Sequence, residues 1–181
     1  ILESGGGIAP AVDRILDLIA ASDCCLGTGH LSPCESAALI ERASARGVRR
    51  IVVTHPEWSC TFFPIDLQRR LASVAGVWFE RCYVSCTHRG GFTPMKTIAD
   101  AIAEVGCEST ILSTDLGQPD TPPPVEGLRL FCDALRSFGF SPENLRRMAV
   151  DNPCALLGIQ PVSGASTAAE ERSAQTRGVA L

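Results

Sequence analysis

Two histidines and one aspartate follow stretches that have the composition of buried strands. His30, His55 and Asp115 each come at or just after the end of such a stretch. The three stretches cover residues 24–28, 50–54 and 110–114. In parallel sheets and barrels, functional groups gather at the carboxyl ends of the strands. Imidazole and carboxylate suit catalytic metals, so the pattern predicts a divalent metal on these three residues, with zinc as the first candidate and manganese or iron as alternatives.

This ligand set predicts hydrolysis by an activated water. A divalent metal lowers the pKa of a bound water from about 15.7 toward roughly 7. A neighbouring carboxylate can then accept the proton that the water loses. Asp115 is therefore a candidate for two roles, metal ligand and catalytic base.

Each of the three residues also has an ordinary structural explanation. His30 ends a Gly-Thr-Gly-His turn that could cap the following helix, and His55 lies directly before Pro56. Asp115 precedes a Leu-Gly pair, where Asp commonly stabilises a turn. The shared position after three separate strands favours the metal site over three unrelated explanations.

Three further polar residues have open roles. Glu80 is either an acid at the rim of the site or a solvated charge near a strand end. Together with Gln118, it is a candidate for substrate binding. His88 lies in a loop with a Gly-Gly pair, which indicates an exposed or substrate-edge role rather than metal ligation.

The elements that must position these residues form a regular alternation. Between residues 8 and 160, short β-rich runs alternate with helical patterns, which predicts an α/β fold with about four parallel strands and outer helices. Strands are expected at residues 24–28, 50–54, 77–83 and 110–114. Helices are expected at about residues 9–21, 32–47, 64–74, 93–104, 125–138 and 152–157, with a helical turn from residue 141. Ser32 and Asn152 are the expected N-caps of two of these helices.

Composition limits the partners. The 181 residues are enough for one domain with a substantial core. A net charge of −4 gives no attraction to nucleic acid or to an anionic membrane, and we expect neither as a partner. No apolar run approaches the roughly 20 residues of a membrane helix. The expected partner is a small-molecule substrate.

The nine cysteines indicate a reducing compartment. Their number is odd, they contain no Cys-x-x-Cys pair, and none has an adjacent histidine in the sequence. The first residues lack a basic segment followed by an apolar one, as an export signal would have. We therefore expect reduced thiols and a cytoplasmic protein.

Four motifs resemble the later strands of amidohydrolase-superfamily barrels. They are Thr-Gly-His-Leu-Ser at 28–32, Val-Thr-His-Pro at 53–56, Leu-Ser-Thr-Asp-Leu-Gly-Gln at 112–118 and Asn-Pro-Cys-Ala-Leu-Leu-Gly at 152–158. More narrowly, they are similar to a poorly characterised group of predicted metal-dependent hydrolases in that superfamily. The resemblance covers about residues 10 to 160.

The resemblance implies both a fold and a set of roles. Residues 1–160 would be the C-terminal half of a (β/α)8 TIM-type barrel, strands 5 to 8, and residues 161–181 a disordered tail. His30 and His55 would be the metal ligands after strands 5 and 6. Asp115 would follow strand 8, where it orients and deprotonates the attacking water. The implied activity is hydrolysis of a C–N or C–O bond in an amide, lactone or related cyclic substrate.

The sequence departs from that family in one important respect. Amidohydrolase barrels open with a His-x-His pair on strand 1, and no such pair occurs in this sequence. Four strands alone also leave sheet edges and one sheet face open. We therefore expect a complementary half-barrel or a second copy as a partner. The alternative is a non-catalytic half-barrel that acts through association with a partner chain.

Overall fold

The fold is built on one parallel sheet, seen in a computed structural model that describes residues 1–161. The four strands pair in the order β1-β2-β3-β4, each parallel to the next. Their bounds are Leu26–Gly27 for β1, Ile51–Thr54 for β2, Val77–Cys82 for β3 and Thr110–Ser113 for β4. The predicted α/β class with four parallel strands is confirmed. The expected tail, except Pro161, lies outside the described residues.

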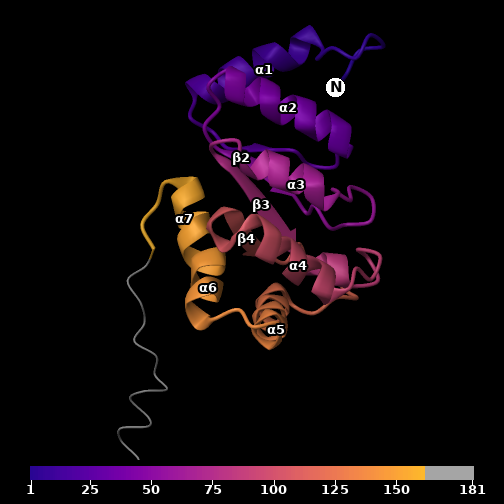
Figure 1. Cartoon of the computed structure of the whole chain (residues 1–181), viewed down its shortest axis with the longest axis vertical. Helices are drawn as coiled ribbons and strands as arrows, with labels where there is room; N and C mark the ends of the chain where they lie inside the picture. The colour runs from indigo at the N-terminus through magenta and orange to yellow at the C-terminus, as the bar shows by residue number, and fades with distance from the viewer. Residues whose placement is uncertain (162–181) are drawn as a thin grey trace, which may run out of the picture.

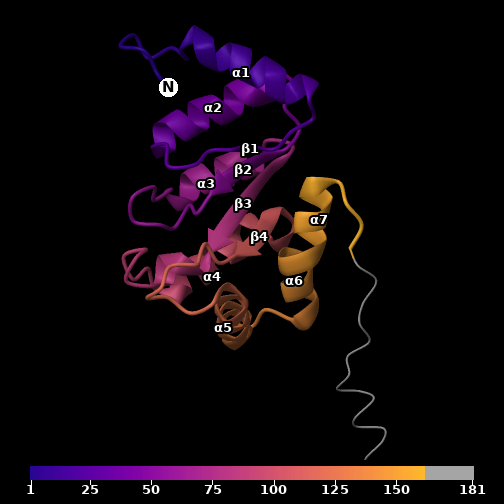
Figure 2. The same ribbon diagram turned by 180° about the vertical axis from the view of Figure 1, so that it is seen from behind.

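Helices separate the strands along the chain. The α-helices are α1 (Pro10–Ala21), α2 (Pro33–Ala45), α3 (Ile65–Ala72), α4 (Met95–Val105), α5 (Pro124–Ser137), α6 (Pro142–Arg146) and α7 (Asn152–Leu157). Short 3-10 turns cover Tyr83–Cys86 and Cys107–Ser109. In Figures 1 and 2, α1 and α2 lie side by side at one end of the molecule, and α5 lies at the other. The chain therefore advances from one end to the other.

The helix α2 begins where the sequence predicts. The Ser32 hydroxyl accepts a hydrogen bond from the Glu35 amide at 3.3 Å, and the Glu35 carboxylate accepts one from the Ser32 amide at 3.3 Å. This reciprocal capping box satisfies two amides that the first turn would leave without partners. The start of α2 is thereby fixed close to His30.

Alternation along the strands separates two faces of the sheet. Ile51, Val53 and Phe79 are fully buried on the face covered by α2 and α3. A second group of buried residues from α4 and α5, with Phe131 and Leu135 at its centre, packs against Leu112 of β4. The core thus lies between the sheet and its outer helices.

The C-terminal helices differ from the expectation. Residues 142–157 form α6, a π-helical turn at Arg147–Asp151 and α7 in direct succession. Asn152 is not an N-cap, because it has helical backbone angles (φ −65°, ψ −46°). Pro153 lacks an amide hydrogen, and a wider turn before it is one way for a helix to continue through a proline.

This helical segment crosses the amino ends of the strands. The Asn152 side-chain amide donates to the carbonyl oxygens of Cys107 and Thr110, at 2.7 and 2.6 Å, beside the start of β4. The Leu156 carbonyl accepts hydrogen bonds from Cys25 and Arg50, which precede β1 and β2. The segment therefore closes the end of the sheet opposite to the predicted site.

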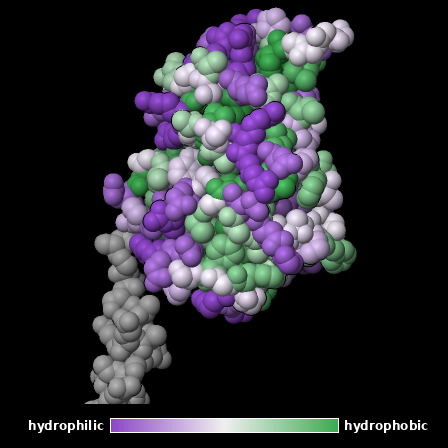
Figure 3. Space-filling view, viewed as in Figure 1, coloured by the Kyte–Doolittle hydropathy of each residue, from purple (hydrophilic) through white to green (hydrophobic). Residues whose placement is uncertain are grey.

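The inner face of the sheet is less open than the sequence suggests. An open sheet face predicts that inner side chains such as Val52 and Ile111 present exposed apolar surface. Ile111 is only 7% exposed, and it lines a hollow together with Ala149 and Pro153 of the C-terminal helices. Val52 is half-buried. The surface in Figure 3 mixes hydrophilic and hydrophobic residues, and no helix among the described residues is long and apolar enough to cross a membrane.

Asn152 should be one of the main residues that hold the C-terminal helical segment to the start of β4. We expect Asn152→Ala to lower the free energy of unfolding by about 2 kcal/mol, because two carbonyl oxygens near β4 lose their shared donor. Urea denaturation followed by circular dichroism measures the change. Ser137→Ala, at an exposed position on α5, is the control and should change stability by less than about 0.5 kcal/mol.

The isosteric variant Asn152→Asp separates hydrogen bonding from packing. It keeps the size of the side chain but replaces the donor with a carboxylate facing two carbonyl oxygens. An unchanged unfolding midpoint in Asn152→Asp would contradict the role of Asn152.

Candidate metal centre

The carboxyl ends of the strands surround a polar pocket of about 200 Å³. It is lined by His30, Thr54, His55, Glu80, Cys82, Ser113 and Asp115. The structure thus brings together all three predicted ligands and the predicted rim acid Glu80. Thr54 is paired with Glu80, and Cys82 with Ser113. The strand register therefore places these side chains at two successive levels on one face of the sheet, near its carboxyl end.

The two histidine rings lie against each other and against a tryptophan. The ring centroids of His30 and His55 are 4.8 Å apart, and Trp58 lies edge-on to both rings, at 5.7 and 4.6 Å. His30 is exposed, whereas His55 is only 2% exposed. The pocket therefore has one fixed imidazole and one at its mouth.

A hydrogen-bond chain sets the tautomer of His55. The Thr61 hydroxyl donates to the His55 carbonyl oxygen at 3.1 Å and lies 3.0 Å from Nδ1 of the same residue. Because the hydroxyl has one hydrogen, which the carbonyl receives, it accepts a hydrogen bond from Nδ1–H. The lone pair is then on Nε2, as a metal ligand requires. The buried Thr61 was not anticipated from the sequence, where it is one polar residue in a loop.

Burial and neighbouring charges set the ionisation of the pocket. Burial lowers the pKa of His55, while the nearby Asp115 carboxylate opposes that shift. Burial also raises the pKa of Glu80; the Ser113 side chain, hydrogen-bonded to Glu80, lowers it, and Asp115 raises it. Glu80 is half-buried and lines the pocket, which favours the acid at the rim over a freely solvated charge. A neutral His55 beside two carboxylates suits a cation.

Backbone strain coincides with the pocket. His55 and Asp115 have φ values of +31° and +51°, and Gly29, just before His30, has +57°. Among residues 1–161, only two other non-glycine residues, Asp23 and Phe92, have positive φ. Left-handed conformations of non-glycine residues are unfavourable and concentrate at functional sites. The strain at His55 and Asp115 therefore indicates that these two turns are kept for function.

Gln118 and His88 lie outside the pocket lining. The Gln118 side-chain amide donates to the Asp115 carbonyl oxygen at 3.4 Å, so it contacts the turn that carries the carboxylate. His88 is exposed, as expected, and its Nε2 lies 2.7 Å from the Asp120 carboxylate. The structure therefore links Gln118 to the site only through the backbone of Asp115.

Cys82 and Ser113 complete the lining and were not singled out from the sequence. Both belong to predicted strands, two residues after Glu80 and two before Asp115. That two-residue spacing was the available signal, because such residues share a face of a strand. Burial strongly raises the pKa of Cys82, so burial favours the neutral thiol.

The donors are of the right kind but do not form a complete coordination sphere. Across residues 1–161, no three His, Cys, Asp or Glu side chains are arranged so that they could hold a metal ion. The pocket nevertheless holds two imidazoles and two carboxylates, which fit a borderline divalent cation chemically. To coordinate an ion, these side chains would have to move closer together or be joined by a further ligand.

Comparison with known proteins adds one similarity. A family model described as "Family of unknown function (DUF6282)" matches residues 1–80. The matched segment carries both pocket histidines and ends at Glu80. The chain matches no curated protein and no solved structure. Since the matched family has no described function, the amidohydrolase resemblance stays a prediction.

The strained turn after β4 allows a test of whether Asp115 is kept for function rather than for stability. Asp115→Gly should raise the free energy of unfolding by about 0.5–1 kcal/mol, because glycine adopts a positive φ without the steric penalty of a Cβ. Chemical denaturation measures the difference. Asp100→Gly, in the middle of α4, is the control and should be destabilising by about 1 kcal/mol. A destabilised Asp115→Gly would mean that the carboxylate supports the fold itself.

Glu80 should make stability depend on pH. Its pKa in the folded state is raised by burial above the ordinary value of 4.5, so the folded protein holds this proton more tightly than the unfolded chain. The contribution is fully present below pH 4.5 and is lost as pH rises through the higher folded pKa. Glu80→Gln should therefore flatten the stability profile above pH 4.5. Thermal unfolding from pH 4 to 8 tests this, and parallel profiles for both proteins would contradict it.

Proposed function

We propose that this protein is a metal-dependent hydrolase that acts on a C–N or C–O bond of a small amide, lactone or related cyclic substrate. The supporting observation is the convergence of His30, His55, Glu80 and Asp115 in one pocket at the carboxyl end of a parallel sheet. The sheet accords with the C-terminal half of a (β/α)8 barrel, and that finer description is part of the proposal. The proposed cation is zinc, with manganese or iron as alternatives.

Each residue of the pocket has a separate role in the proposed reaction. His55, held by Thr61 with Nε2 available, is the anchoring ligand, and His30 at the mouth is the second. A bound divalent cation would lower the pKa of a coordinated water and supply the nucleophile. Asp115 accepts a proton at its carboxylate, because it is the exposed acid at the rim. Glu80, deeper in the pocket, is the proposed substrate contact.

The site is proposed to become complete only in an assembly. In a parallel sheet of four strands, β1 and β4 are edge strands with unpaired backbone groups on one side. A complementary half-barrel or a second copy would pair with these edges and supply further ligands. The incomplete set of donors among the described residues is what favours this extension.

The same observation favours a second candidate function. A half-barrel that no longer closes a coordination sphere would act through association with a partner chain, without catalysis. In the first candidate the chain's own donors already hold one cation tightly and a partner completes the coordination, whereas a relic binds the cation weakly.

Zinc titration of the purified full chain tests the proposal. By competition with a chromogenic chelator, we expect one zinc ion per chain. His55→Ala should weaken binding by at least about tenfold, and Thr61→Val by about 10- to 100-fold, the usual effect of losing a residue that orients a ligand. His88→Ala is the matched control, since it removes an exposed histidine outside the pocket. Equal losses in His55→Ala and His88→Ala would show that zinc binds elsewhere.

Turnover tests the role of Asp115 once an active assembly is identified. Asp115→Asn keeps the size of the side chain and one oxygen ligand but removes the base. The chemical step should fall by roughly 10² to 10⁴, with zinc retained, while His55→Ala should chiefly lower zinc affinity. Near-normal turnover of zinc-loaded Asp115→Asn would rule out this carboxylate as the base.

A further inference from the structure

Two loops at the carboxyl end of the sheet are joined through a single carboxylate. Asp120 belongs to the loop between β4 and α5, and Arg89 to the loop between β3 and α4. Arg89 donates to Asp120 Oδ1 from Nε and Nη2, at 2.9 and 2.6 Å. Arg89, and after it His88, lowers the pKa of Asp120 to about 2, so the carboxylate is ionised at neutral pH. Since an ionised carboxylate only accepts, His88 Nε2, 2.7 Å from Oδ2, donates a third hydrogen bond.

The loop that carries Arg89 packs tightly against its neighbours at two glycines. A Cβ atom on Gly90 would lie 2.3 Å from the Cα of Ser85, and one on Gly91 would lie 2.7 Å from the Oγ of Ser59. These close approaches fix the backbone directly after Arg89.

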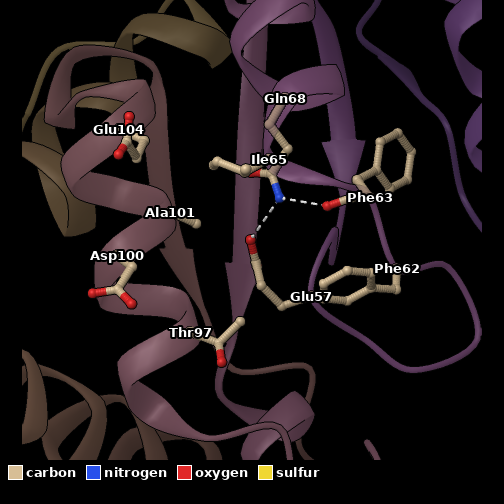
Figure 4. Close-up of a pocket in the computed structure, with 9 residues that line it drawn as sticks. All are labelled: Glu57, Phe62, Phe63, Ile65, Gln68, Thr97, Asp100, Ala101 and Glu104. Carbon is tan, nitrogen blue, oxygen red and sulfur yellow. Dashed lines mark hydrogen bonds between the residues drawn. The ribbon is translucent and has the colours of Figure 1, made fainter.

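The same loop is bonded to the turn that follows His55. The Thr93 hydroxyl donates to the Glu57 carbonyl oxygen at 2.9 Å. Figure 4 shows the Gln68 side-chain amide between the Glu57 carboxylate and the Phe63 carbonyl oxygen, to which it donates at 3.3 and 3.0 Å. The loop after β3 is therefore a fixed support beside the pocket.

The loop that carries Asp120 has fewer supports of its own. Within the described chain, residues 115–117 make no backbone-to-backbone hydrogen bond. The Leu116 side chain packs on α5, where a Cβ atom on Gly127 would lie 2.3 Å from its Cδ1. The ion pair of Asp120 is therefore an important restraint on this loop.

A short chain of hydrogen bonds connects Asp120 with Asp115. The Thr121 amide and hydroxyl both donate to the Gln118 carbonyl oxygen, at 3.1 and 2.8 Å. The Gln118 side-chain amide donates to the Asp115 carbonyl oxygen at 3.4 Å. A displacement of Asp120 would therefore be transmitted to the strained turn that presents the Asp115 carboxylate.

We propose that Asp120 is a positioning residue: paired with Arg89, it holds the loop after β4 against the loop after β3 and so fixes the Asp115 carboxylate at the strand-end pocket. Its functional meaning rests on the proposed role of Asp115 as ligand and base. An exposed ion pair contributes little to global stability. The Arg89–Asp120 pair therefore acts on the local order of the loop rather than on the fold.

Backbone ¹⁵N relaxation of the full chain, without zinc, tests this role. In Asp120→Ala, order parameters across residues 115–121 should fall from roughly 0.85, typical of ordered backbone, toward about 0.6. Residues 87–92 should stay ordered, because they keep their other supports. The matched control is Asp133→Ala on α5, whose carboxylate is similarly exposed (44% against 48%) and also binds two basic side chains. It should leave the loop unchanged.

Exchanging the two charges separates the pair from either residue alone. Arg89→Asp should disorder the loop as Asp120→Ala does, whereas Arg89→Asp/Asp120→Arg should restore at least about half of the lost order. His88→Ala leaves both Arg89 contacts in place and should leave the loop ordered, so it stays a valid control in the zinc titration.

The ring resonances of His30 and His55 report the position of Asp115 without zinc. Asp120→Ala should move them in the same direction as Asp115→Asn does, by a smaller amount, and Asp133→Ala should not move them. In the zinc titration, Asp120→Ala should weaken binding by about two- to fivefold, less than His55→Ala.

Several results would overturn the proposal. They are unchanged order parameters in Asp120→Ala, equal changes in Asp133→Ala, no recovery in the charge-exchanged variant, ring resonances that stay in place while the loop becomes mobile, or zinc binding by Asp120→Ala as tight as that of the unaltered chain. If the unaltered chain binds no zinc while the relaxation and ring measurements behave as expected, the metal site alone is contradicted. The two proposals can therefore fail separately.

Discussion

The parallel register between β2 and β3 is the constraint on which the site depends. Thr54 lies opposite Glu80, and Glu80 lies opposite Ile111. Parallel strands place all their carboxyl ends at one edge, so His55 after β2 and Asp115 after β4 meet above Glu80. A shift of one residue in β3 would move Glu80 to the helix-covered face and Arg81 into the pocket. The chemistry of the pocket is therefore a consequence of strand pairing.

The same register forces a buried ion pair on the opposite face. Arg81 follows Glu80 and points toward the outer helices, where it is fully buried and pairs with Glu57 and Gln68. Burial lowers the pKa of Arg81 to about 9, so it stays charged at neutral pH. Removing one member of such a pair typically destabilises a protein by about 3–5 kcal/mol, because the other charge is left alone. Glu57 is two residues after His55, so this pair also holds the turn that presents the imidazole.

Local pattern was enough to predict the strands and most of the helices, because each of these carries its own signals. The buried runs of β2 and β4 and the capping box at Ser32 lie within a few residues of one another in sequence. The convergence of His30, His55 and Asp115 could be predicted because strand ends in a parallel sheet share an edge. The roles of Asn152 and Thr61 could not. Asn152 bonds carbonyl groups 42 and 45 residues away, and Thr61 acts through a loop whose path follows no periodic rule. Glu57 and Arg81 were missed for the same reason, since their pairing depends on three-dimensional packing.

The two faces of β3 connect the strand-end pocket with the buried ion pair. Glu80 and Cys82 line the pocket, while Arg81 between them pairs with Glu57 on the face covered by the outer helices. The His55 turn has a φ of +31°, and Glu57, two residues after His55, pairs with the buried Arg81. The position of the imidazole therefore depends on strand pairing on one face of β3 and on a buried ion pair on the other.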